Sequence, residues 1–194
     1  MKLAIVKYNA GNTVSVANAL RRVGVEAAIT DDPDMIRLAD KVIFPGVGEA
    51  SSAMAYLRGR GLDKVITTLT QPVLGICLGM QLMCDFSEEN NTKCLGIFPY
   101  RTERFAPGSV KVPHTGWNQI SRLNSPLFDG VPEHSHFYFV HGYYVGVGAE
   151  TTAVAEHGMK FSAGISRDNF YAVQFHPEKS GEAGQKILEN FLNL

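Results

Sequence analysis

The sequence has no long block of like charge and no long hydrophobic run. Its 18 Lys and Arg residues nearly balance its 19 Asp and Glu residues, and the net charge is −1. Broad binding to nucleic acid or to an anionic membrane needs a basic face, which this balance does not favour. No apolar stretch approaches the roughly 20 residues that span a bilayer. The N-terminal apolar stretch is interrupted by Lys7, unlike the core of a signal peptide. We therefore expect a cytoplasmic protein that binds neither nucleic acid nor membrane.

Cysteine is also scarce. The sequence has three cysteines, Cys77, Cys84 and Cys94. An odd count without the spacing of a disulfide framework fits a protein of a reducing compartment. The chain has no C-x-x-C motif, and its six histidines show no H-x-x-x-H spacing. We expect no metal site and no cofactor, and we expect Cys84 and Cys94 to be buried structural residues.

Short apolar runs alternate with helical periodicity in the first half of the chain. The pattern predicts strands at residues 3–8, 25–30, 42–44 and 72–76, helices at 14–23 and about 50–60, and a last helix at 184–194. Residues 96–174 carry shorter runs, such as 136–140 and 143–147, which suit antiparallel pieces at the far side of a sheet. We predict an α/β fold with a mostly parallel, mixed, twisted sheet flanked by helices. With 194 residues and no repeat or linker, one domain over 1–194 is expected.

The most informative motif is GICLGMQ at residues 75–81. It has the G-x-nucleophile-x-G pattern of a nucleophile elbow, with Cys77 as the nucleophile. Gly75 and Gly79 fit because a Cβ at either position would collide with neighbouring backbone in so tight a turn. The turn places Sγ at a helix N-terminus, which favours the reactive thiolate. It also aims the Leu78 N–H at an oxygen that becomes negative after attack. Alone, the motif also fits a buried structural cysteine.

A hydrophobic strand at residues 170–175 ends in His176-Pro177-Glu178. Pro177 forbids helix at its own position and pushes His176 toward extended geometry. Residues two apart on an extended chain face the same way. Glu178 is therefore predicted to bond one ring nitrogen of His176 and to leave the other nitrogen for the thiol proton. This gives Cys77, His176 and Glu178 as nucleophile, base and orienting acid.

These two motifs together resemble the class I (triad) glutamine amidotransferases. Four further stretches are similar to one family within that class, the glutaminase subunits of imidazole glycerol phosphate synthase in histidine biosynthesis. They are PGVG at 45–48, VPHTGWN at 112–118, YFVHGYY at 138–144 and QFHPEKS at 174–180. The resemblance covers almost the whole chain and implies a flavodoxin-like fold that hydrolyses L-glutamine to glutamate and ammonia through a glutamyl thioester.

The resemblance also implies roles for individual residues. The oxyanion would be held by the N–H of Leu78 and by a backbone N–H of the 46–48 loop, with Val47 and Gly48 as the donors. In the family this loop is thought to become active only when the partner is engaged. Glutamine would contact Gly46, Gln81 and the backbone of Gly142 and Tyr143.

The implied partner is a (β/α)8-barrel cyclase subunit. It receives the ammonia and makes imidazole glycerol phosphate and aminoimidazole carboxamide ribotide. The candidates for the face that meets it are Asn12, Trp117, Tyr138 and Lys179.

Four positions depart from the family pattern. Lys7 and Asn9 replace Asp and Gly, Thr115 replaces Met, and Gly142 stands where Ser or Thr is commoner. The first two bear on the partner interface and Gly142 bears on the positioning of glutamine.

Two other functions remain open at this point. One is the glutaminase subunit of another synthase, such as that for anthranilate or pyridoxal phosphate. The other is a catalytically silent scaffolding subunit. The VPHTGWN stretch argues against the first and the intact triad against the second.

Overall fold

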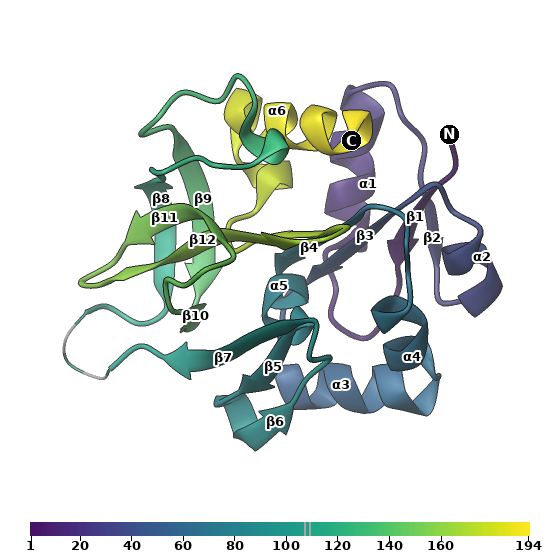
Figure 1. Cartoon of the computed structure of the whole chain (residues 1–194), viewed down its shortest axis with the longest axis horizontal. Helices are drawn as coiled ribbons and strands as arrows, with labels where there is room; N and C mark the ends of the chain where they lie inside the picture. Colours follow the sequence, from purple (N-terminus) through teal and green to yellow (C-terminus); the bar gives the residue numbers. More distant parts are fainter. Residues whose placement is uncertain (107, 109) are drawn as a thin grey trace.

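The computed structural model describes residues 1–106, 108 and 110–194. Within these residues a seven-stranded sheet runs through the middle, with helices on both faces (Figure 1). Its order is β11 (Thr151–Glu156), β12 (Lys160–Arg167), β13 (Phe170–Val173), β4 (Val73–Cys77), β3 (Lys41–Gly46), β1 (Leu3–Val6) and β2 (Ala28–Thr30). The strands from β13 to β2 pair in parallel, and β12 and β11 extend the sheet antiparallel. The predicted α/β class with a mixed, mostly parallel sheet is confirmed.

The central strands are buried on both faces, which explains their near-continuous apolar sequences. In β1, Leu3 and Ile5 pack into one core while Ala4 and Val6 pack into the other. The first core lies under α1 (Thr13–Arg22) and α6 (Gly181–Asn193). The second lies under α2 (Pro33–Arg37), α3 (Ala50–Gly59), α4 (Leu62–Thr67) and α5 (Leu78–Met83). Figure 1 shows α1 and α6 on the opposite side of the sheet from α3, α4 and α5.

Helices α2 and α4 were not predicted, because five and six residues are too few to show a helical period. The acidic cluster before Met35 forms the start of α2. The Asp32 carboxylate accepts hydrogen bonds from the N–H groups of Asp34 and Met35, and Pro33 occupies the first helical turn.

Two smaller sheets and three 3₁₀ turns complete the described part of the chain. One sheet has the order β10 (Tyr143–Val145), β7 (Phe98–Arg104), β5 (Cys84–Ser87) and β6 (Thr92–Lys93), and the other is the antiparallel pair β8 (His114–Gln119) and β9 (His136–His141). The turns are η1 (Glu89–Asn91), η2 (Pro126–Phe128) and η3 (Pro177–Lys179). The antiparallel pieces predicted for the second half are confirmed, but the runs at 136–140 and 143–147 lie in these smaller sheets, and β12 and β11 form the far side of the main sheet. None of the described helices is long and apolar enough to cross a bilayer.

Candidate active site

The predicted site segments meet at the carboxyl ends of three neighbouring strands. Gly46, at the end of β3, lies opposite Cys77, at the end of β4, and Val173 of β13 lies opposite Ile76. His176 follows β13 by three residues. The carboxyl ends of parallel strands share one edge of a sheet, which is where α/β proteins build their sites. The sheet therefore brings together three motifs that are far apart in sequence.

Cys77 occupies a strained turn between β4 and α5. Its backbone has φ 53° and ψ −107°, a region that non-glycine residues rarely adopt and that clusters at functional sites. A Cβ at Gly79 would overlap the carbonyl group of Phe44, and one at Gly75 would lie 3.1 Å from the backbone nitrogen of Met80. The expected collision with backbone is confirmed at Gly79, whereas at Gly75 the backbone contact is only tight and the closest atom is the Met83 sulfur at 2.8 Å. All three cysteines are buried, and burial raises the pKa of the Cys84 and Cys94 thiols to about 12.

His176 and Glu178 form a buried pair. Nδ1 of His176 lies 2.8 Å from Oε1 of Glu178, and both side chains are fully buried. His176 is extended, with φ −103° and ψ 95°, as its position before Pro177 predicts. The reason expected for the contact was nevertheless wrong. Residues 177–179 form the 3₁₀ turn η3, and this turn rather than an extended chain carries Glu178 beside the imidazole.

A third side chain completes this pair. The amide of Asn12, at the start of α1, donates to Oε1 of Glu178 at 2.7 Å. Asn12 was expected on the partner face, and in the structure its side chain is turned toward the triad. It was missed as a support for Glu178 because no sequence motif links residues 166 positions apart.

His176 and Glu178 each favour the charged form of the other. Burial alone would lower the pKa of His176, but the nearby Cys77 sulfur and Glu178 carboxylate outweigh burial and raise the pKa to about 10. Burial likewise raises the pKa of Glu178, yet His176 and then Asn12 hold it below its ordinary value. Nε2 of His176 has no hydrogen-bond partner among the described residues. With this raised pKa, Nε2 can take the proton of the adjacent Cys77 thiol and hold it as an imidazolium.

Cys77 opens onto a cavity of about 430 Å³. Leu78, Gln81, Gly142 and Tyr143 line it, as does the Val47–Gly48 loop. Gly46, which was predicted to contact glutamine, is not among the lining residues, and a Cβ there would overlap the Tyr8 hydroxyl. Two lining residues, Glu89 and Arg104, lie outside every stretch named in the sequence analysis. Four others lie in the 112–118 and 138–144 stretches, to which no role in the cavity was given: Val112, Pro113, Val140 and His141. They belong to no short motif around Cys77, so only the folded chain shows that they share its cavity.

The predicted oxyanion donor of the loop is occupied in this structure. The N–H of Val47 donates to the carbonyl oxygen of Ala10 at 2.7 Å. Gly48 has φ 118°, a conformation open to glycine and rare for other residues. Val47 N–H must therefore leave Ala10 before it can serve an oxyanion.

Trp117, Tyr138 and Lys179 gather at one surface, which we call the aromatic–lysine cluster. Trp117 is 56% exposed, and its ring meets the Tyr138 ring edge-on at 6.2 Å. The Lys179 ammonium lies 5.7 Å from the centre of the Tyr138 ring. The backbone carbonyl of Tyr138 accepts the N–H of His176 at 2.9 Å, so the cluster lies directly behind the base.

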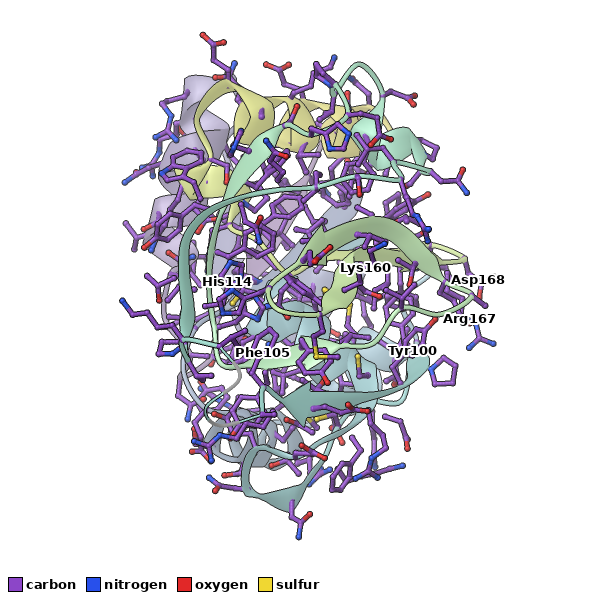
Figure 2. All side chains as sticks on the ribbon, turned by 90° about the vertical axis from the view of Figure 1, so that its left-hand side faces the viewer. Tyr100, Phe105, His114, Lys160, Arg167 and Asp168 are labelled. Atoms are coloured by element: carbon purple, nitrogen blue, oxygen red, sulfur yellow. The ribbon has the colours of Figure 1, made fainter. Side chains whose placement is uncertain are left out.

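A second group of histidines packs beside the cavity. Nδ1 of His141 lies 2.7 Å from the carbonyl oxygen of Tyr143, and Nε2 lies 3.0 Å from Nδ1 of His114. His157 stacks on His114 at 4.2 Å. Burial, followed by the His157 imidazole, lowers the pKa of His114 to about 4. Burial and the neighbouring imidazoles lower the pKa of His141 to about 3, although its bond to the Tyr143 carbonyl acts in the opposite direction. Figure 2 views the molecule from this end and labels His114 and Phe105. Among the described residues, no group of three or more His, Cys, Asp or Glu is placed to hold a metal.

The comparisons with known proteins agree with this geometry. Residues 4–194 match the family described as glutamine amidotransferase class-I. The chain is 59% identical to imidazole glycerol phosphate synthase subunit HisH of Bacteroides fragilis (strain YCH46), with 100% of both chains covered. It is 46% identical to the same subunit of Haemophilus influenzae (strain Rd), over 99% of this chain and 97% of that one. A crystal structure described as a glutamine amidotransferase shares the fold, with a TM-score of 0.77 at 19% identity and 98% and 97% of the chains covered. The chain therefore belongs to the class I glutamine amidotransferases and, within them, to the family of imidazole glycerol phosphate synthase subunit HisH.

Proposed function

We propose that the chain, as one domain over residues 1–194, hydrolyses L-glutamine through a Cys77–His176–Glu178 triad. The Cys77 thiolate attacks the side-chain amide carbon, while His176 carries the thiol proton to the departing nitrogen and ammonia leaves. Water then cleaves the glutamyl thioester, releasing glutamate and restoring the thiol. Glu178 stabilises the imidazolium that forms between these steps. The observation that carries the proposal is the fully buried His176–Glu178 pair, whose free ring nitrogen adjoins a strained cysteine.

The cavity supports an amino-acid substrate. Glutamine is a zwitterion, and Glu89 and Arg104 bring one charge of each sign to the cavity wall. The Glu89 carboxylate is held by the N–H of Ala50 at 2.7 Å. We propose that Glu89 meets the α-amino group and Arg104 the α-carboxylate, with Gln81, Gly142 and Tyr143 between them. Gly46 contributes by its lack of a side chain, which lets the loop lie close to Tyr8.

The occupied Val47 N–H supports a gated oxyanion hole. With Val47 bonded to Ala10, Leu78 is left as the predicted donor, and losing one such donor typically costs about 2.7–4 kcal/mol of transition-state stabilisation. We propose that engagement of a partner releases Val47, or turns the N–H of Gly48 inward, and so completes the hole.

The proposed partner is a (β/α)8-barrel cyclase subunit that takes the ammonia and forms imidazole glycerol phosphate and aminoimidazole carboxamide ribotide. The aromatic–lysine cluster supports a docking surface, because exposed aromatic residues are favoured at interfaces. Its link to the His176 N–H through the Tyr138 carbonyl gives docking a short path to the triad.

A glutaminase assay tests both parts of this function. We expect the isolated chain to release little glutamate from glutamine and to gain activity when a cyclase subunit carrying its ligand is added. Cys77→Ala should abolish glutamine hydrolysis and leave ammonia-driven cyclisation by the complex intact. Glutamate release by Cys77→Ala would exclude Cys77 as the nucleophile, and full activity of the isolated chain would exclude the gate.

A further inference from the structure

A pair of buried side-chain amides connects the cavity wall to the nucleophile. Nε2 of Gln81 lies 3.1 Å from the carbonyl oxygen of Tyr143 and 3.0 Å from Oε1 of Gln174. Nε2 of Gln174 lies 3.7 Å from Sγ of Cys77. Gln174 is fully buried, and Gln81 is 5% exposed. A buried amide without partners is costly, so these contacts fix how both groups are oriented.

The direction of each hydrogen bond follows from chemistry. The amide nitrogen of Gln81 faces two oxygens, so it donates both of its hydrogens. Flipping this amide would place its oxygen against both of those oxygens. Because Oε1 of Gln174 accepts from Gln81, the other half of the Gln174 amide, its N–H, must point at Sγ. The carbonyl of Tyr143 is itself held by Nδ1–H of His141 at 2.7 Å, so this orientation is anchored at both ends.

We propose that Gln174 is a nucleophile-positioning residue that donates a hydrogen bond to Sγ of Cys77 and is held in that orientation by Gln81. The inference deepens the proposed function and rests on Cys77 being the nucleophile. A thiolate accepts a hydrogen bond more strongly than a thiol, so a fixed donor stabilises the charged sulfur. The protonated sulfur has a different partner, the carbonyl oxygen of Val140, at 3.8 Å. Gln174 thus favours the thiolate form of Cys77 and fixes the direction from which Sγ accepts a hydrogen bond.

The test is the pH dependence of Cys77 alkylation by iodoacetamide in the whole chain, followed at each cysteine by peptide mass. It requires neither glutamine nor a partner. Gln174→Met removes the donor from a side chain of similar length. We expect its alkylation rate at Cys77 to be about tenfold lower on the acid side of the curve, and the midpoint to move to higher pH. Gln81→Met leaves Gln174 in place but frees it to turn, and we expect a smaller shift in the same direction. Gln119→Met, the same substitution at an exposed position of β8, should match the wild type.

The outcomes separate this inference from the proposed function. If Cys77 of the wild-type chain reacts no faster than buried Cys84 and Cys94, the assignment of the nucleophile fails. If Cys77 reacts selectively but keeps its wild-type curve in a folded Gln174→Met chain, only the role of Gln174 fails. Exposure of Cys84 and Cys94 to the reagent would show that Gln174→Met has unfolded. Gln81→Met then decides, and a wild-type curve there overturns the proposal.

Discussion

Two buried side-chain pairs that contain histidine lie beside the same cavity. The imidazole is charged in one pair, and both imidazoles are neutral in the other. His176 faces the Glu178 carboxylate at 2.8 Å, and its pKa is raised to about 10. His141 faces the His114 imidazole at 3.0 Å, and their pKa values fall to about 3 and 4. Burial acts against the charged form in both pairs, so burial does not distinguish them. The neighbours of each imidazole decide its charge. The Cys77 sulfur and the Glu178 carboxylate favour the charged form of His176, whereas neighbouring imidazoles disfavour it in His114 and His141.

This difference in charge gives the two pairs different roles: His176 is suited to proton transfer, and His141 and His114 are suited to positioning the cavity wall. A neutral His141 donates Nδ1–H to the Tyr143 carbonyl, which leaves Nε2 to accept from Nδ1–H of His114. His114 Nε2 in turn faces the amide of Asn118 at 3.3 Å. Each ring nitrogen of His141 and His114 therefore has a partner. This series of hydrogen bonds holds the cavity wall and leaves neither histidine a nitrogen for proton transfer. His176 has one nitrogen bonded to Glu178 and the other without a hydrogen-bond partner among the described residues, and its raised pKa suits it to take and hold the thiol proton.

The largest expected effect comes from removing the charged imidazole. His176→Asn should lower the glutaminase kcat of the partner-bound enzyme by at least about 10³-fold, because the thiol proton loses its acceptor. His136→Asn, at an exposed position of β9, is the matched control and should retain activity. Steady-state assays of glutamate release measure both. A kcat within tenfold of wild type for His176→Asn would contradict the assignment of the base.

Glu178→Gln tests whether the carboxylate sets the charge of His176. The side chain keeps its shape, but the imidazolium loses its counter-charge, so kcat should fall roughly 10²-fold. NMR titration of the His176 ring should also show a lower pKa than in the wild type. An unchanged titration would mean that Glu178 does not control that charge.

Asn12→Ala distinguishes a triad support from an interface residue. The hydrogen bond to Glu178 is lost, and bonds to charged groups are worth about 1.5–3 kcal/mol. We expect kcat to fall about tenfold, with the Kd for the cyclase unchanged. A weaker Kd with normal kcat in the complex would return Asn12 to the partner face.

The smallest expected effect is on stability, and its sign differs between the two pairs. His114 and His141 take up protons near pH 6.5 in the unfolded chain but only near pH 4 and 3 when folded, so stability falls as the pH drops below 6.5. Each contributes a slope of at most about 1.4 kcal/mol per pH unit. His176 acts oppositely, because its raised pKa stabilises the fold below pH 6.5 and this stability is lost as the pH rises toward 10.

Urea unfolding between pH 4 and 6.5 measures the slope. His114→Gln should reduce the slope of unfolding free energy against pH, while His134→Gln, at an exposed loop position, should leave it unchanged. Equal slopes for wild type and His114→Gln would show that the folded chain protonates this histidine normally.

Much of the site could be predicted because it is built from local motifs. A strand that ends in a glycine-flanked cysteine dictates its own strained turn, and a proline fixes the residue before it. The supports could not be predicted, because Asn12, Glu89 and Gln174 act on groups that only the fold brings near. The charge of each histidine could not be predicted from the sequence either, because it depends on which side chains are buried next to the imidazole.

The sequence by itself determined the parallel α/β core, through apolar runs that must be buried on both faces, and it indicated Cys77, His176 and Glu178 as the candidate catalytic residues. Only the tertiary structure decided which atoms face one another: that Val47 N–H is bonded to Ala10, that Asn12 turns inward, and that the second histidine pair stays neutral. Hydrogen bonds and charge interactions act over a few ångströms. Asn12 and Glu178, 166 positions apart in the chain, come within that range only after the sheet has formed.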